Sequence, residues 1–333
     1  MAEPSTRGAQ LLKTLFLRLG VLPVLLVIAI AIFAITADQF LTPQNLINML
    51  RQSVYLILVS LGQMLALVTG GLDLSVGTIL AITSVVGATV MAAVYAAHPD
   101  AAWTAVAIGS ACGLLAGTAV GLVNGIGIAF VGVSPFIMTL GVQSVGFGIA
   151  LYLTGGVPVS GLPAEFGEVL GFGRLLGMPT PVLAVVICVA LFYVLMSRTA
   201  LGTYFLAVGG NPKAAALSGV NVKRTLLWAY LLCALVTSVS GVLLSARLES
   251  GESNIGGTVA LESIAASIIA GVSLRGGIGR VENVVLGAIF IVLVQNGMNV
   301  AGVGSYLQMV VLGLLLIVAV VSDQFRHRML AGD

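Results

Sequence analysis

The sequence predicts an all-α membrane protein in which a single domain, residues 1–333, forms one bundle of about ten transmembrane helices. Of the 333 residues, 59% are hydrophobic and 8% are charged, whereas about a quarter of the residues in an average soluble domain carry a charge. Mean hydropathy is +1.15. The 42 glycines favour helices that pack closely through small residues in lipid. This composition excludes an ordinary soluble fold.

Each predicted span is an apolar run that ends at polar residues, glycine or proline. A helix needs about 20 apolar residues to cross about 30 Å of hydrocarbon. We expect the first run to be a retained helix rather than a cleaved signal, because it is long and no clean cleavage motif follows it. Ser134-Pro135 and Thr180-Pro181 mark helix starts, since a hydroxyl caps a helix and proline suits its first position. The predicted spans are 19–37, 54–70, 76–97, 103–130, 136–153, 180–197, 226–246, 260–274, 284–301 and 306–322.

Basic residues predict the orientation of these spans, because Lys and Arg are retained on the cytoplasmic side during insertion. The cytoplasmic parts are then an N-terminal segment at 1–18, a loop at 198–225 and a tail at 323–333, so both termini are cytoplasmic. Only Arg51, Arg174 and Arg247 fall outside, where half of the twelve acidic residues also lie. The inner basic residues are Arg7, Lys13, Arg18, Arg198, Lys213, Lys223, Arg224, Arg275, Arg280, Arg326 and Arg328.

Two segments of the sequence resemble each other and lie five predicted spans apart. They cover residues 122–141 and 293–313. An odd number of spans between them would place the two copies upside down to each other, as in transporters built from inverted repeats. One interpretation is therefore an inverted five-helix repeat. The other is a chance similarity between apolar, glycine-rich helices.

The sequence holds no pattern of a catalytic or metal site. His98 lies in an outer loop and His327 in the tail, and no metalloprotease, serine hydrolase or P-loop motif occurs. Cys112, Cys188 and Cys233 lie inside apolar runs without paired spacing, which indicates neither a disulfide framework nor a zinc site. A net charge of +2 does not indicate nucleic-acid binding. We predict no catalytic residue, metal or cofactor in this chain.

Five polar residues in or beside the apolar runs are candidates for a translocation pathway or its gate: Asp73, Ser75, Glu262, Asn296 and Asn299. A carboxylate near membrane depth is costly and is therefore a functional candidate. The alternative for Asp73 and Ser75 is a structural cap on the helix that follows them. Asn296 and Asn299 are one helical turn apart, and their alternative is hydrogen bonding between helices.

The inner loop at 198–225 is predicted to contain a short helix outside the membrane. Gly209-Gly210 form a flexible joint, Asn211 can cap the helix, Pro212 suits its first position and Gly219 can end it in the left-handed conformation. Ala214–Ala216 then offer a smooth surface to a partner's groove. The alternative is an interfacial helix that rests on lipid headgroups.

Four motifs occur together in this chain: GGLDLSVG (70–77), GGNPKAAALSGVNV (209–222), SLRGG (273–277) and NGMNVAGVGSYLQ (296–308). In combination they resemble the permease subunits of bacterial ribose, xylose, arabinose and galactose-type ABC importers. The resemblance covers nearly the whole chain. It departs from the family at Gly146-Phe147-Gly148, where relatives commonly carry an arginine-glycine pair, and at Arg280-Val281-Glu282, where they usually have small or apolar residues.

This resemblance implies an inner-membrane permease that imports a monosaccharide by alternating access and is driven by separate ATPase subunits. Its implied partners are a second permease copy, an ATPase that binds the ATP, and a periplasmic sugar-binding protein. The implied coupling helix to the ATPase comprises Gly209, Gly210, Asn211, Pro212, Lys213, Ala214, Ala215, Ala216, Leu217, Ser218 and Gly219.

Two other transport functions are alternatives. The branched-chain amino-acid permeases of the same superfamily are the closer one. An ion-driven secondary transporter would usually place several ionisable groups near the membrane midplane, and this sequence has almost none there beyond Asp73 and Glu262.

Overall fold

The structure is a computed structural model that describes residues 22–175 and 177–331. The predicted segment at 1–18, the first residues of the predicted span at 19–37 and the last two residues of the predicted tail lie outside this part. The helices are α2 (Leu22–Thr36), α3 (Pro43–Val68), α4 (Val76–Ala97), η1 (Pro99–Ala101), α5 (Ala102–Ile126), η2 (Gly127–Val131), α6 (Pro135–Thr154), η3 (Phe166–Gly171), α7 (Thr180–Arg198), α8 (Ala200–Gly210), α9 (Pro212–Leu217), α10 (Val222–Leu248), α11 (Val259–Ile269), α12 (Val281–Val300) and α13 (Ser305–Ala331). A two-stranded hairpin pairs β1 (Arg174–Leu175) with β2 (Met178–Pro179).

The predicted all-α membrane fold is confirmed. Within the described residues, seven helices are long and apolar enough to cross a membrane, namely α3, α4, the run Pro99–Val131, α6, α7, α10 and α12. Four apolar helices are shorter: α2, α8, α11 and the apolar part of α13, Ser305–Val321. The predicted spans between residues 76 and 197 match α4 to α7 within a few residues.

One predicted boundary, the start of the second span, is wrong for a local reason. α3 begins at Pro43 rather than at residue 54, because Thr42 caps it and its hydroxyl accepts from the Asn45 amide at 3.4 Å. Polar side chains in the first turns of α3 interrupt the apolar run without ending the helix. α13 continues to Ala331, so the predicted tail at 323–333 begins inside a helix.

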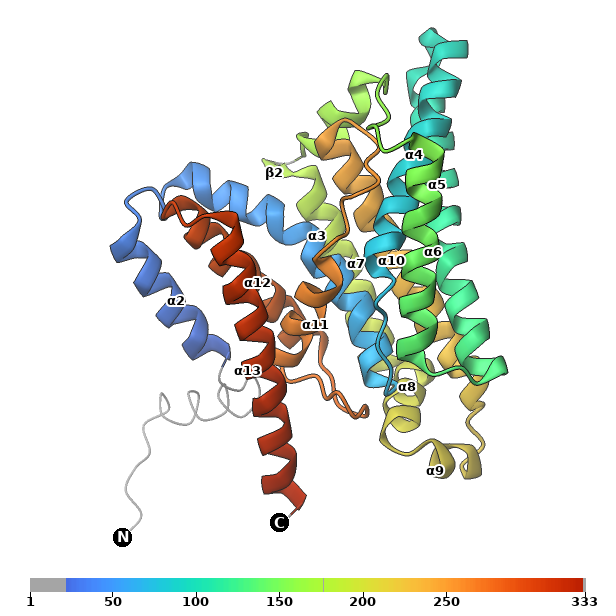
Figure 1. Ribbon diagram of the computed structural model, residues 1–333, viewed down its shortest axis with the longest axis vertical. Helices are drawn as coiled ribbons and strands as arrows, with labels where there is room; N and C mark the ends of the chain where they lie inside the picture. The colour runs from blue at the N-terminus through green and yellow to red at the C-terminus, as the bar shows by residue number, and fades with distance from the viewer. Residues whose placement is uncertain (1–21, 176, 332–333) are drawn as a thin grey trace.

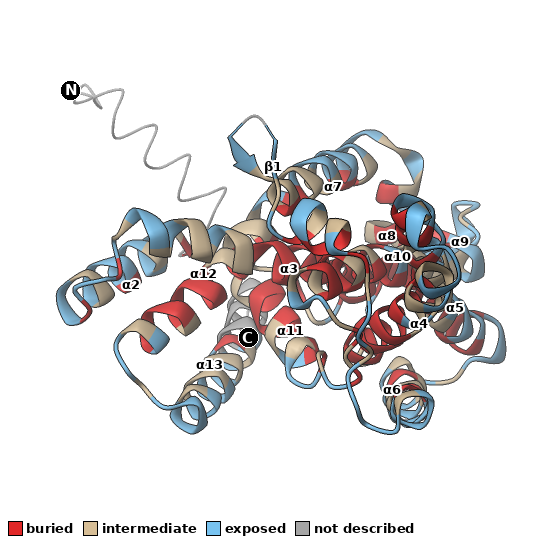
Figure 2. Ribbon diagram, turned by 90° about the horizontal axis from the view of Figure 1, so that it is seen from above, coloured by how far each residue is buried: buried red, intermediate tan, exposed pale blue. Residues whose placement is uncertain are grey.

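α3 is the central helix of the bundle. Every residue from Ser53 to Val68 is buried, and Figure 2 shows α3 enclosed by the helices around it. α10, α12, α11 and α7 pack against it. Helices associate in lipid through close packing rather than through transfer out of water. The fit of these neighbours therefore fixes the position of α3.

Glycines at every fourth position let α5 approach two neighbouring helices closely. A Cβ on Gly113 would lie 2.7 Å from the Thr83 carbonyl oxygen of α4, and one on Gly121 would lie 2.7 Å from the Tyr230 carbonyl oxygen of α10. This spacing is the small-residue pattern of closely packed membrane helices. The glycines are Gly109, Gly113, Gly117, Gly121 and Gly125.

The chain between α10 and α11 is irregular, with one β-bridge at Gly251 followed by turns, and it packs against the bundle. Gly251 and Val159 exchange two backbone hydrogen bonds of 2.9 Å, and Gly256 lies against Gly77 at the start of α4. α11 has 11 residues, about 16 Å at 1.5 Å per residue, which is too short to cross about 30 Å. The prediction of a full helical span at 260–274 is therefore wrong. Irregular backbone at membrane depth is tolerated where protein buries it or where it lines a cavity.

The bundle has two distinct ends, and we call the one that carries α9 the α9 end (lower end in Figure 1). The α5–α6 connection and the described end of α13 lie there, while the α4–α5 and α12–α13 connections lie at the opposite end. The two similar segments, 122–141 and 293–313, thus turn at opposite ends of the bundle, as an inverted repeat requires. A repeat of all five helices stays a prediction.

Candidate functional site

A helical arm, residues 199–221, projects from the bundle at the α9 end (Figure 1). The Thr199 hydroxyl caps α8. The Asn211 side-chain oxygen caps α9 by accepting from the Ala214 amide at 3.0 Å. Pro212 occupies the first position of α9, and Gly219 follows with a φ of 85°. The short helix predicted for this loop is therefore present, and its docking role stays a prediction.

Gly209 and Gly210 form the last turn of α8, so the prediction of a flexible joint is wrong. The Gly277 amide donates to the Val68 carbonyl oxygen at 2.8 Å. A Cβ on Gly209 would collide with that oxygen and would lie 2.7 Å from the Gly277 nitrogen. We call this meeting of Gly209, Val68 and Gly277 the glycine contact. It ties the arm to the end of α3 and to the loop after α11.

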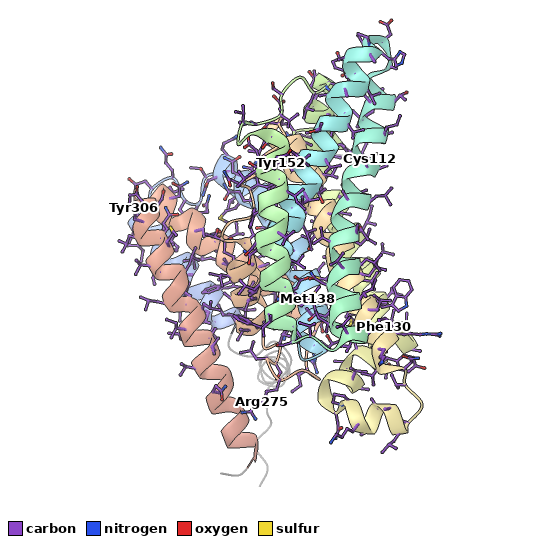
Figure 3. The ribbon with its side chains drawn as sticks, turned by 45° about the vertical axis from the view of Figure 1, so that its right-hand side comes forward. Cys112, Phe130, Met138, Tyr152, Arg275 and Tyr306 are labelled. Carbon is purple, nitrogen blue, oxygen red and sulfur yellow. The ribbon has the colours of Figure 1, made fainter. Side chains whose placement is uncertain are left out.

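The exposed face of α9 differs from the face that the sequence predicts. Ala215 is 5% exposed and turns toward the protein, whereas Leu217 is 92% exposed. Lys213, Ala214 and Ala216 are also exposed. A partner at this surface would therefore contact Leu217 and its exposed neighbours rather than Ala215. Figure 3 places Arg275 and Phe130 at this same end, and Tyr306 at the other.

The GGLDLSVG segment folds into the bundle between α3 and α4. Asp73 and Ser75 are fully buried. Asp73 Oδ1 accepts from the Ser75 amide at 2.9 Å and from the Ser75 hydroxyl at 2.6 Å. The Asn124 amide of α5 donates to the Ser75 hydroxyl at 2.7 Å. Ser75 precedes α4 but makes no side-chain cap bond to it, so the carboxylate stabilises the turn before the helix. A role of this group in gating stays a prediction.

Glu262 lies on a cavity of about 250 Å³ that α3, α4, α10, α11 and α12 enclose. Its Oε1 accepts from the Thr258 hydroxyl at 2.7 Å. The Arg247 guanidinium lies 5.5 Å from the centre of the Tyr55 ring. Leucine and valine side chains form the rest of the wall. The polar side chains on the cavity are Gln52, Tyr55, Arg247, Glu262 and Gln295.

Asn296 and Asn299 lie in different environments. Asn296 is 4% exposed, and it exchanges two hydrogen bonds of 2.8 and 3.0 Å with Asn45 at the start of α3. Asn299 is exposed. Asn296 thus binds α12 to α3, and it lies outside the set of residues that line the cavity.

The structure therefore brings together Asp73 with Ser75 and places Glu262 in a separate cavity with residues that the sequence analysis missed. Gln52 and Tyr55 are three positions apart on α3, a spacing that puts both on one helical face. This spacing was the one sign in the sequence that Gln52 and Tyr55 could line a common site. Arg247, placed in an outer loop by the sequence, lies in the last turn of α10.

Residues 45–320 match the family model described as "Branched-chain amino acid transport system / permease component". The chain belongs to this permease family. No solved structure matches the chain.

Three relatives of this permease are named for sugars. It is 35% identical over 300 residues to the ribose import permease protein of Bacillus subtilis, a match that covers 90% of each chain. It is 35% identical over 324 residues to the galactose/methyl galactoside import permease protein of Escherichia coli, covering 94% of this chain and 96% of the relative. It is also 35% identical over 301 residues to the D-allose transport system permease protein of Escherichia coli, with 90% of each covered.

Proposed function

We propose that this chain is the membrane-spanning permease subunit of an ATP-driven importer that carries a monosaccharide across the inner membrane. Similarity to relatives named for ribose, galactose and allose along at least 90% of the chain carries the proposal. In this function a second permease copy completes the passage, a periplasmic binding protein delivers the sugar, and a separate ATPase supplies the energy by alternating access. In this proposal the ATP site lies in the separate ATPase.

The arm supports a contact with the ATPase at the α9 end. A capped helix held by the glycine contact is stiff, and it presents Leu217 to whatever lies beyond the bundle. Basic residues gather in the connections at this end, which fits a cytoplasmic location under the positive-inside rule. These residues are Arg198, Lys213, Lys223, Arg224, Arg275 and Arg280.

The test assembles the permease with an ATPase subunit and a sugar-binding protein from the same organism and measures uptake into proteoliposomes. We expect uptake of at least one of D-ribose, D-galactose and D-allose, and none of L-leucine. Uptake of L-leucine alone would support the branched-chain amino-acid alternative. Uptake that follows an ion gradient without ATP would instead support a secondary transporter.

Leu217→Asp tests the ATPase contact directly. Withdrawing a buried leucine from an interface costs about 1.5–3 kcal/mol, so the ATPase should co-purify roughly 10- to 100-fold less well. Leu175→Asp is the matched control, because Leu175 is 59% exposed on the hairpin at the opposite end. Equal co-purification of both variants would remove the arm from the ATPase contact.

A further inference from the structure

The cavity beside Glu262 lies toward the end opposite α9. Arg247 is in the last turn of α10, and Gln295 is in the final third of α12. α11 begins at the cavity, directly after the irregular, turn-rich segment that follows α10. Backbone of this irregular kind persists at membrane depth where it lines a cavity.

The Tyr55 hydroxyl lacks a hydrogen-bond acceptor among the described residues that line this cavity. Its side chain is 9% exposed, and its hydroxyl has no hydrogen-bond acceptor within the described part of the chain, although the Arg247 guanidinium lies near enough to donate to the phenolic oxygen. Arg247 lies over the ring, and arginine offers donors but no acceptor. In this arrangement the described residues offer the phenolic proton no acceptor, so an acceptor on a molecule bound in the cavity would satisfy it. A buried polar group left without a partner costs about 1–3 kcal/mol.

The other polar groups of the cavity indicate the chemical class of the ligand that carries this acceptor. Gln52 and Gln295 each offer a donor and an acceptor, while Glu262 and Arg247 carry opposite charges. The aliphatic wall suits C–H groups, as small-molecule sites commonly combine apolar walls with a few placed polar groups. A neutral molecule with several hydroxyls on a carbon ring matches this mixture. The volume of about 250 Å³ equals roughly eight waters at about 30 Å³ each.

We propose that this cavity is a binding subsite for one neutral, monosaccharide-sized polyol on its way through the permease, with the Tyr55 hydroxyl donating to a sugar oxygen. The inference rests on the proposed function and deepens it. Gln52, Gln295 and Glu262 bind further hydroxyls, and Arg247 holds the Tyr55 ring in place. Binding is weak, because a passing solute must also leave.

The test compares Tyr55→Phe with wild type in the assembled importer. Phenylalanine keeps the ring under Arg247 and removes only the hydroxyl. We expect uptake of the sugar that wild type carries to fall about three- to tenfold, the effect of about one hydrogen bond. ATP hydrolysis stimulated by the loaded binding protein should stay within about twofold of wild type. Tyr193→Phe is the matched control, since Tyr193 is an exposed tyrosine of α7 outside this cavity.

A second measurement detects occupancy of the cavity without uptake. Gln295→Cys in the assembled importer, with the native cysteines replaced, should react with a small thiol reagent more slowly when D-ribose, D-galactose or D-allose is present. L-leucine should give no protection. Protection by L-leucine alone would overturn the polyol assignment.

The outcomes separate this inference from the proposed function. A wild-type importer that moves none of the three sugars contradicts the proposed function. Normal sugar uptake in wild type together with equal uptake in Tyr55→Phe and Tyr193→Phe overturns the subsite alone. A purely structural Tyr55 also predicts unchanged uptake, because removing its unpartnered hydroxyl leaves the packing intact.

Discussion

Replacing Gly209 with alanine should disrupt the glycine contact, whereas the same change at Gly210 should not. A Cβ on Gly209 would meet backbone on two sides, the Val68 carbonyl and the Gly277 nitrogen at 2.7 Å, and backbone cannot move aside as a rotamer can. A Cβ on Gly210 has its nearest neighbour at 4.0 Å. In a helix, alanine in place of glycine even gains about 1 kcal/mol.

The cost of Gly209→Ala follows from these contacts. Overpacking of this kind costs about 1–3 kcal/mol, and separating Gly277 from Val68 loses a hydrogen bond of 2.8 Å worth about 1 kcal/mol. Together these costs come to about 2–4 kcal/mol, so the docked arm should become roughly 30- to 1,000-fold less populated. Uptake should fall while ATP hydrolysis by the assembled importer continues, since the ATPase site lies in another subunit.

Uptake and ATP hydrolysis, measured side by side in proteoliposomes, give the ratio of solute moved to ATP consumed. Gly209→Ala should lower this ratio, and Gly210→Ala should leave it near the wild-type value. Trypsin cleavage of the arm should also be faster in the first variant. If the two alanine variants behave alike, the glycine contact does not hold the arm.

Three further predictions concern other parts of the bundle. In a cysteine-free background, a cysteine at the exposed Glu168 should react with an impermeant thiol reagent from the periplasm and one at Lys213 should not; the reverse labelling would invert the orientation. A double-mutant cycle of Asn45→Ala and Asn296→Ala should give a coupling free energy of about 0.6–1.7 kcal/mol, as hydrogen bonds between membrane helices do, and a value near zero in thermal unfolding would contradict the bond. Asp73→Asn should keep the fold, since its oxygen still accepts at Oδ1, whereas Asp73→Ala should lower the melting temperature; equal melting of both would show that this acceptor is not needed.

Local chemistry explains what could be predicted from the sequence. The short helix α9 was predictable because Asn211, Pro212 and Gly219 start and end it through contacts with residues nearby in the sequence. Its buried face was not, because the orientation of Ala215 depends on how the whole arm docks. That docking rests on Gly209, Val68 and Gly277, which are far apart in the sequence.

The cavity could not be predicted either, because it also depends on residues far apart in the sequence. Its polar lining comes from α3, α10, α11 and α12, so no segment of the sequence contains the site. The half-length of α11 was also hidden, because residues 260–274 are as apolar as a full span. The glycine-rich chain before α11 looks like an ordinary outer loop, and only its contacts with α4 through Gly251 and Gly256 reveal that it enters the bundle.

One helix that lines the cavity, α3, ends at the glycine contact, and the loop after a second, α11, reaches it. α3 carries Tyr55 on the cavity and Val68 at the contact, about 20 Å apart at 1.5 Å per residue. α11 carries Glu262 on the cavity, and the loop that follows it bears Gly277. Because α3 is one continuous helix from Tyr55 to Val68, a displacement of the arm that moves Val68 should also move Tyr55. We therefore expect movement at the α9 end to change the distance between Tyr55 and Glu262, and with it the contacts that a solute bound in the cavity can make.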